Sequence, residues 1–248
     1  MRINWTILRN PWAVFGGLLS CIVLFGLALF FVQVVSYVGD IRAGEPDPFA
    51  MDDYTRRAKV ILTRAPIAPE IRSRIESVEG NPLIGNPDAP IRIVEFLDYE
   101  CPFCQRSAPE VRAFMSRNPD DVLLIIRDFP LESVHPNAMN AAIAAQCVFQ
   151  NDGADAYWLY HDILYRNQVD LSVPALRTYA QTVRANLSAY DSCMDSRQPE
   201  SRIKLSIQDA ITAGARGTPT FYVNGYAIPG AVDLATLEAL LVELKARL

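Results

Sequence analysis

The chain has few of the residues that build metal sites or nucleic-acid surfaces. It holds only two histidines and five cysteines in 248 residues, and its net charge is −5. A structural zinc site needs several Cys or His ligands at short spacing, and no such cluster exists around His135 or His161. Binding to nucleic acid needs a basic excess, which is missing. We therefore expect no bound metal and no nucleic-acid partner, and nothing in the sequence calls for another cofactor.

Charge is also missing from one long stretch near the N-terminus. No charged residue occurs from Trp12 to Val38, a run long enough to cross the ~30 Å hydrocarbon core as a helix. Arginines precede this run and acidic residues follow it, at Arg2 and Arg9 and at Asp40, Glu45 and Asp47. The positive-inside rule then predicts a single-pass protein of the cell membrane, with residues 12–38 in the bilayer and a cytoplasmic N-terminus. The rest of the chain would lie outside the cytoplasm, in the periplasm or at the cell surface.

Two alternatives exist for this N-terminal run. A cleaved signal peptide has an apolar region of only about 7 to 15 residues before a small-residue cleavage site, and Val34-Val35-Ser36 is a poor site. Leu18 to Cys21 faintly resembles a lipidation motif, but the apolar run continues far beyond it. We favour an uncleaved anchor. The predicted organisation is a cytoplasmic stub and membrane helix over residues 1–40, a stalk over 41–85 and a folded domain over 86–248.

Two of the five cysteines form the motif Cys101-Pro102-Phe103-Cys104. The motif follows the apolar run Ile91 to Leu97 and precedes the helix-like stretch Gln105 to Arg117. Unpaired N–H groups at a helix start favour an anion, so the first thiol is expected to ionise near neutral pH and to react by thiol–disulfide exchange. Half of a zinc site is the alternative, and its other ligands are missing. The pattern therefore predicts a redox-active dithiol.

The periodicity beyond the motif predicts an α/β fold with a helical insertion. Val122 to Ile126 is a second strand-like run, so the active-site helix completes a βαβ unit. Residues of about 135–215 show almost only helical periodicity. The predicted helices are Asn137 to Phe149, Asp155 to Tyr165, Val173 to Val183, Ala189 to Asp195 and Glu200 to Ala215. Asn224-Gly225 then predicts a hairpin between Thr220 to Val223 and Tyr226 to Ile228, followed by a last helix from Leu234 to Arg247.

A second motif, Gly217-Thr218-Pro219-Thr220-Phe221-Tyr222-Val223-Asn224-Gly225, completes a family pattern. Together with the first motif, with Pro109 eight residues after Cys101 and with Glu95 six residues before it, it resembles the DsbA-like thiol–disulfide oxidoreductases of the thioredoxin superfamily. The resemblance covers roughly Asn86 to Leu248. It implies a thioredoxin fold interrupted by an α-helical subdomain, here preceded by one transmembrane helix.

The resemblance also implies roles for individual residues. Cys101 is expected to be the nucleophile and Cys104 the resolving thiol. Thr218-Pro219 would form the cis-proline loop that binds clients beside Pro102 and Phe103. Glu95 stands where relatives carry a buried acid, which burial would give a raised pKa and a role in moving the Cys104 proton. Asp98 competes for that role, and we favour Glu95.

The remaining pair, Cys147 and Cys193, lies on two predicted helices of the insertion. Some DsbA-like proteins carry a second bridge in this subdomain, so a structural disulfide is favoured over two free buried thiols. His135 begins a helix and His161 lies on a helix rich in aromatic residues, and neither is given a catalytic role.

The expected activity is oxidation of cysteine pairs in exported proteins. The resemblance implies reoxidation by a membrane quinone-linked partner of the DsbB or VKOR kind. Phe103 leaves the direction open, because the strongest oxidants of the family have His there. A reductase or isomerase of the same fold is therefore an alternative, and a redox-inactive extracytoplasmic subunit of a membrane complex is another.

Overall fold

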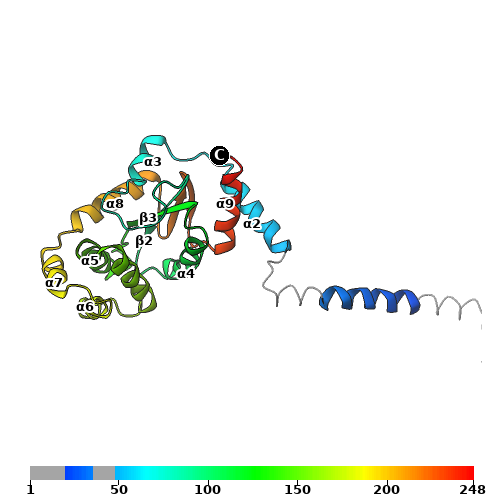
Figure 1. Cartoon of the computed structure of the whole chain (residues 1–248), viewed down its shortest axis with the longest axis horizontal. Helices are drawn as coiled ribbons and strands as arrows, with labels where there is room; N and C mark the ends of the chain where they lie inside the picture. The colour runs from blue at the N-terminus through cyan, green and yellow to red at the C-terminus, as the bar shows by residue number, and fades with distance from the viewer. Residues whose placement is uncertain (1–19, 36–47) are drawn as a thin grey trace, which may run out of the picture. The chain divides into compact units, whose positions relative to one another are not determined.

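The computed structural model describes residues 20–35 and 48–248 of the chain. The chain divides into two compact units, Met1–Asp53 and Tyr54–Leu248. In the first unit, residues 20–35 form a helix (blue in Figure 1). Across the described ranges, no helix is both long enough and apolar enough to cross a membrane. The anchor predicted from Trp12 to Val38 lies partly outside these ranges.

The second unit is built on one five-stranded sheet with the order β1-β3-β2-β4-β5. β2 and β3 are parallel, and the other pairs are antiparallel. The strands are β1 (Leu83–Gly85), β2 (Ile91–Leu97), β3 (Val122–Asp128), β4 (Thr220–Val223) and β5 (Tyr226–Pro229). β2 is buried except for the half-exposed Arg92, as expected for a strand with neighbours on both edges and helices on both faces.

Helix α4 (Pro102–Arg117) connects the two parallel strands. Side chains alternate along β2, so Ile93, Glu95 and Leu97 lie on one face and Val94 and Phe96 on the other. The first face packs in one apolar cluster with α4, α5 (Ala138–Arg166) and α9 (Leu234–Lys245), and the second face packs with α3 (Pro69–Ile75) and α8 (Glu200–Ala213). Glu95 is thus the one acid that β2 turns toward the active-site helix.

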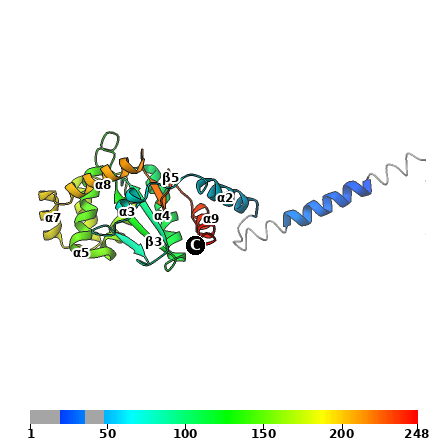
Figure 2. The same cartoon turned by 90° about the horizontal axis from the view of Figure 1, so that it is seen from above.

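The helical insertion consists of α5, α6 (Val173–Thr182), α7 (Leu187–Ser196) and α8. The two helices predicted at Asn137 to Phe149 and Asp155 to Tyr165 meet end to end in α5, across Gly153 with φ 84°. That backbone conformation favours glycine because it carries no Cβ. Figures 1 and 2 both place α7 at the opposite end of this unit from α9, so the insertion extends the domain away from its C-terminal helix.

The folded unit begins earlier than predicted. The sequence assigned residues 41–85 to a stalk, but the second unit starts at Tyr54. α2 (Pro48–Ile61) contributes the buried Ala58, α3 contributes the fully buried Ile75, and β1 pairs with β3 at the sheet edge. β1 is only three residues long, too short for a readable alternation. The boundary predicted at residue 86 is therefore too late.

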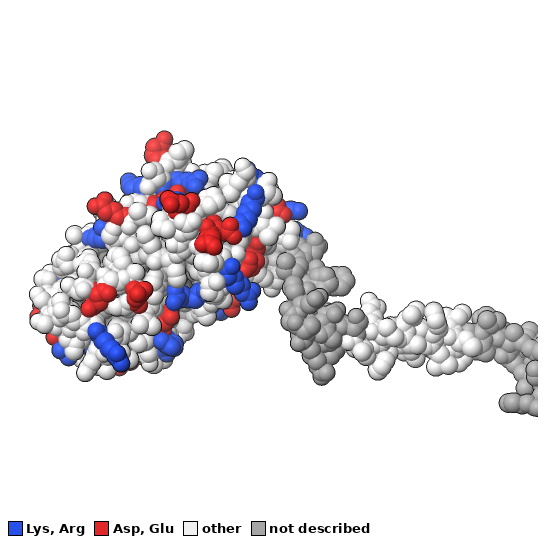
Figure 3. All heavy atoms as spheres, in the orientation of Figure 1, with Lys and Arg blue, Asp and Glu red and all other residues white. Residues whose placement is uncertain are grey.

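A buried ion pair ties α8 to the sheet and to α3. The Arg127 guanidinium, at the end of β3, donates to Asp209 of α8 at 2.5 Å and to the backbone carbonyl of Ile75 at 3.2 Å. At the surface, Figure 3 shows Lys and Arg interleaved with Asp and Glu on the face in view. This face therefore carries no broad patch of a single sign.

Candidate active site

Cys101 and Cys104 lie where β2 meets α4. Cys101 is the N-cap residue of α4, and Cys104 lies in its first turn. Cys101 is 3% exposed and Cys104 is fully buried, and both are free thiols in this structure. Pro102 occupies the first helical position, where its missing N–H costs no hydrogen bond. The helix start therefore holds two sulfurs in different surroundings only three residues apart.

The two thiols have opposite pKa shifts. A hydrogen bond from the Cys104 side chain lowers the pKa of Cys101 to about 5, although burial opposes the shift, and hydrogen bonds from Thr218 and from the backbone of Cys104 and Phe103 lower it further. Burial raises the pKa of Cys104 well above its usual range, and the neighbouring Cys101 raises it further. At neutral pH Cys101 is therefore a thiolate and Cys104 a thiol.

The loop before β4 lies against the Cys101 sulfur. The Thr218-Pro219 peptide bond is cis, and Cys101 Sγ lies 3.2 Å from the Thr218 carbonyl oxygen. The Thr218 hydroxyl is buried, and among the described residues it has no hydrogen-bond partner apart from that sulfur. The fold thus brings two motifs 117 positions apart into contact.

The two candidate acids are placed differently. Glu95 is 2% exposed, and burial raises its pKa to about 8. The Asp98 carboxylate already binds backbone donors, because it accepts hydrogen bonds from the N–H groups of Glu100 and Leu131, each at 2.8 Å. Its Oδ2 also lies 2.8 Å from His135 Nδ1. Glu95 is therefore a buried acid near the dithiol whose protonation can change near neutral pH.

Apolar side chains surround the approach to Cys101. Phe103 is 53% exposed, and the Arg106 guanidinium lies 5.2 Å from its ring centroid. Pro102 is also exposed, and Val169 is fully exposed. Val169 follows Gln168, whose side chain bonds the Cys101 carbonyl oxygen, so these exposed residues form an apolar rim near the nucleophile. Such a rim suits an unfolded chain with exposed apolar groups.

Two glutamines that the sequence analysis did not single out connect the insertion to the dithiol. Gln168 Nε2, just after α5, donates to the carbonyl oxygens of Tyr99 and Cys101 at 2.8 and 2.9 Å. Gln105 Nε2, on α4, donates to the Tyr165 carbonyl oxygen at 2.7 Å. No local sequence signal marks either residue, because both contacts depend on how α5 packs against α4.

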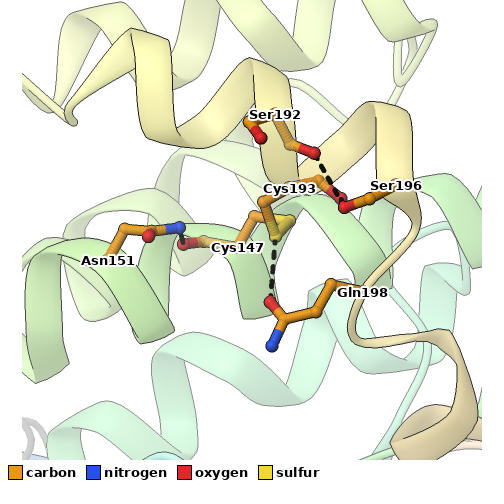
Figure 4. Close-up of a disulfide and its surroundings, with 6 residues drawn as sticks. All are labelled: Cys147, Asn151, Ser192, Cys193, Ser196 and Gln198. Atoms are coloured by element: carbon orange, nitrogen blue, oxygen red, sulfur yellow. Dashed lines mark hydrogen bonds between the residues drawn. A yellow bond between two sulfur atoms is a disulfide. The ribbon is translucent and has the colours of Figure 1, made fainter.

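The second cysteine pair is a disulfide. Cys147 of α5 and Cys193 of α7 are joined with a Cα–Cα distance of 5.8 Å across 46 positions of sequence (Figure 4). The Gln198 side-chain oxygen lies 3.8 Å from Cys193 Sγ. The bond lies within the helical insertion and crosslinks two of its helices.

The two histidines do not belong to the dithiol. Burial lowers the pKa of His161 to about 3, so it is neutral, and its Nδ1 lies 3.2 Å from the Tyr99 hydroxyl. His135 contacts Asp98, as described above. Within residues 20–35 and 48–248, no group of three or more His, Cys, Asp or Glu side chains is arranged to hold a metal ion.

Solved structures with the same fold include several disulfide-exchange proteins. A thioredoxin-like oxidoreductase from Silicibacter pomeroyi DSS-3 is 26% identical, with a TM-score of 0.63, and the match covers 71% of this chain and 98% of that one. The thiol–disulfide exchange protein α-DsbA2 from Wolbachia pipientis is 20% identical, with a TM-score of 0.64 and coverages of 77% and 97%. Oxidised BdbD from Bacillus subtilis is 22% identical, with a TM-score of 0.61 and coverages of 68% and 94%.

Curated relatives share sequence over part of their length. Na(+)/H(+) antiporter NhaA 3 of Salinispora tropica is 33% identical over 155 residues, which cover 62% of this chain and 23% of that protein. Na(+)/H(+) antiporter NhaA 1 of Mycobacterium sp. strain KMS is 35% identical over 160 residues, with coverages of 62% and 25%. The chain thus spans about a quarter of the length of the curated relatives it matches.

The family follows from sequence and structure together. A thioredoxin family model matches residues 77–243, which include both motifs and the helical insertion. The sheet order, the cis-proline loop beside Cys101 and the insertion between β3 and β4 agree with that match. The chain belongs to the thioredoxin family, in the DsbA-like form in which a helical subdomain interrupts the thioredoxin fold.

Proposed function

We propose that this thiol–disulfide oxidoreductase donates disulfides to exported proteins. The observation that carries the proposal is the low pKa of Cys101, about 5, beside the raised pKa of Cys104. A stabilised Cys101 thiolate favours the reduced form of the dithiol, and a dithiol whose reduced form is favoured passes its disulfide to other thiols.

The reaction proceeds by two exchanges at Cys101. A client thiolate attacks Cys101 Sγ of the oxidised protein, the Cys101–Cys104 bond breaks, and Cys104 leaves with the electron pair. Glu95, protonated below its pKa of about 8, can supply the proton that Cys104 then takes. A second client thiolate attacks the client sulfur of the mixed disulfide, the bond to Cys101 breaks, and Cys101 leaves as a thiolate with the electron pair. The client leaves with a disulfide, and the protein retains both electrons as a dithiol.

We expect the apolar rim around Cys101 to bind the client protein. Thr218-Pro219 presents backbone beside the sulfur, and Pro102, Phe103 and Val169 provide apolar contacts. This combination suits an extended, unfolded segment with its own apolar side chains. Such a segment occurs in an exported protein before it folds, when its cysteines are still reduced.

The proposed site of action is the outer face of the cell membrane. Residues 20–35 are helical, without charge, and expose large apolar side chains that include Ile22, Phe25 and Phe31. In water such a surface is unfavourable, so it favours burial in lipid. Residues 12–38 would form the anchor, and a membrane quinone-linked partner of the DsbB or VKOR kind would reoxidise the dithiol.

The direction of exchange is tested by the equilibrium potential of Cys101/Cys104 against glutathione. Phe103 supplies neither the charge nor the hydrogen bonds of a histidine, so we expect a value between about −270 mV of thioredoxin and about −120 mV of DsbA. A value more oxidising than about −180 mV supports disulfide donation. A value near −270 mV would replace the oxidase proposal with the reductase alternative.

The location is tested with a single reactive cysteine. The variant carries Cys21→Ala, Cys101→Ser, Cys104→Ser and Val169→Cys and keeps the Cys147–Cys193 bridge, which does not react with alkylating agents. An impermeant maleimide added to intact cells should label this variant and not the matched variant that retains Val169. Labelling only after the cytoplasm is opened would place the domain inside and contradict the proposal.

A second candidate comes from the curated relatives. A stretch similar to this chain makes up about a quarter of proteins named Na(+)/H(+) antiporters. This favours, as an alternative, a redox-inactive extracytoplasmic subunit of a membrane complex. Mixed disulfides trapped with a Cys104→Ser variant separate the candidates: many exported proteins indicate an oxidase, and no adduct at all indicates a redox-inactive subunit.

A further inference from the structure

Gln168 lies in the turn that follows α5, and its side-chain amide bonds the backbone around the nucleophile. Its Nε2 donates to the carbonyl oxygen of Tyr99 at 2.8 Å and to that of Cys101 at 2.9 Å. Both partners are carbonyl oxygens, which only accept hydrogen bonds, so the NH₂ end of the amide must face them. The side chain is half-buried. One residue of the helical insertion thus uses both N–H groups of its amide on the segment that carries Cys101.

The bonded segment is the turn between β2 and α4. Within it, the Cys101 N–H donates to the Asp98 carbonyl oxygen at 3.2 Å, and the Glu100 N–H donates to the Asp98 carboxylate at 2.8 Å. After it, the Gln105 N–H donates to the Cys101 carbonyl oxygen at 3.1 Å and begins the helical hydrogen bonds of α4. Gln168 bonds one carbonyl inside the turn and one at the start of the helix, so it joins the two.

The peptide between Cys101 and Pro102 has few other restraints. Proline has no backbone N–H, so only the carbonyl of this peptide can form hydrogen bonds. Its partners in the structure are the Gln105 N–H and the Gln168 amide. Gln105 is part of α4 and moves with that helix, whereas Gln168 belongs to the insertion. Among the described residues, Gln168 is therefore the donor outside α4 that sets the direction of this carbonyl.

The direction of the Cys101 carbonyl also decides what the Cys101 sulfur faces. Cys101 has φ −77° and ψ 122°, the extended conformation of a helix N-cap residue. In that conformation an N-cap side chain lies over the unpaired N–H groups of the first helical turn. The backbone N–H groups of Phe103 and Cys104 are among the donors that lower the pKa of Cys101. Rotation about ψ would turn the carbonyl away from Gln168 and these N–H groups away from the sulfur, because both follow the same Cα–C bond.

We propose that Gln168 is a positioning residue that holds the Cys101–Pro102 peptide in the orientation in which the first turn of α4 faces the Cys101 sulfur. It acts through the two backbone carbonyls and makes no described contact with the sulfur. Because Gln168 follows α5, the reactivity of the dithiol then depends on a residue of the helical insertion as well as on the sheet and α4. This inference rests on Cys101 being the nucleophile of the proposed function, and it adds a residue to that site.

The test compares Gln168→Met with Asn167→Leu in the full-length protein carrying Cys21→Ala, because Cys21 is also a free thiol. Methionine keeps the length of the side chain and removes both donors. Asn167 is the neighbouring residue of the same turn, and its amide donates to the Ile163 carbonyl oxygen of α5 at 2.8 Å. The control therefore loses a side-chain donor of the turn without changing a contact to the backbone around Cys101.

The first readout is the pH midpoint of Cys101 alkylation in the reduced protein. We expect the native midpoint near the Cys101 pKa of about 5, and a rise of roughly one unit in Gln168→Met, because a sulfur displaced from the helix start loses donors to its thiolate. Asn167→Leu should keep the native midpoint.

The second readout is the equilibrium with glutathione at pH 7. A rise of one pKa unit is a tenfold change against the reduced form of the dithiol, so the potential of Gln168→Met should be about 30 mV more reducing than that of the native protein. A general loss of packing would lower the denaturant midpoint of unfolding without moving these two readouts together.

A folded Gln168→Met with the native midpoint and the native potential would overturn the inference. Equal shifts in Gln168→Met and Asn167→Leu would also overturn it, because they would indicate a displaced turn. Gln168→Leu repeats the test with a side chain of another shape, and a shift opposite to that of Gln168→Met would contradict a role of the donors. Failure of the proposed function gives a different result: the native potential would then lie near that of thioredoxin, while the difference between the native protein and Gln168→Met would remain.

Discussion

The two cysteine pairs of this protein have the same side chains and different surroundings. Cys101 and Cys104 lie at a helix start beneath an exposed apolar rim, with their pKa values shifted in opposite directions. Cys147 and Cys193 lie inside the helical insertion, joined as a disulfide between α5 and α7. The cysteines of the first pair are only three positions apart and lie among the N–H donors of a helix start. The second pair closes a long loop and has no described acid or base at its sulfurs. Reactivity is therefore set by the environment of each sulfur.

The comparison also shows how each pair contributes to the protein. A disulfide that links distant positions restricts the unfolded chain, and this stabilises the fold. A disulfide between two residues of one helical turn restricts little, so its formation and loss leave the fold intact. The short spacing thus suits repeated oxidation and reduction, and the long spacing suits a permanent crosslink.

The largest effect should come from replacing the two active-site cysteines one at a time. Cys101→Ser should lose disulfide exchange by roughly 10³-fold or more, because it removes the thiolate of the active-site pair. Cys104→Ser should keep the nucleophile and accumulate mixed disulfides that reductant releases. Non-reducing gels of membrane fractions would measure both. Adducts formed through Cys104 in the Cys101→Ser variant would reverse the assigned roles.

Breaking the other pair should affect stability and leave exchange unchanged. The cysteines are 46 positions apart, so the chain-entropy relation predicts that Cys147→Ala or Cys193→Ala lowers the free energy of unfolding by about 4 kcal/mol. The double variant should be no less stable than either single one, since all three lose the same crosslink. Denaturant unfolding with Cys101 and Cys104 kept in one redox state measures this. Additive losses would mean two independently packed thiols.

The smallest effect concerns the hydroxyl beside the reactive sulfur. Thr218→Val removes one donor to the Cys101 thiolate, so the pKa of Cys101 should rise above about 5 by roughly one unit or more. The thiolate contributes its full stabilisation of the fold above the ordinary thiol pKa of 9.0, and this contribution is lost progressively as pH falls to about 5. Alkylation rate against pH gives the midpoint. Thr220→Val is the control, because the Thr220 hydroxyl donates to the Gly217 carbonyl oxygen at 2.7 Å and not to a cysteine. Equal shifts in both variants would indicate movement of the loop.

The sequence by itself determined the central strands of the sheet, the helices of the insertion and the dithiol motif. The strands Ile91–Leu97 and Thr220–Val223 have the predicted bounds, because both are mainly apolar, β-branched or aromatic runs ended by turn or motif residues. The helices of the insertion agree with their periodicity within a few residues at each end, except that two of them merge at Gly153. The CxxC motif could be recognised because its chemistry depends on residues adjacent in the chain.

Only the tertiary structure decided how distant residues meet. Glu95 and Asp98 are equally buried, so the choice between them depends on the donors around Asp98, which come from residues up to 37 positions away. The short strand β1 and the contacts of Gln105 and Gln168 have no local pattern, because each depends on packing between elements. The pKa values of the two active-site thiols belong to this second class as well, since burial and hydrogen bonds across 117 positions set them.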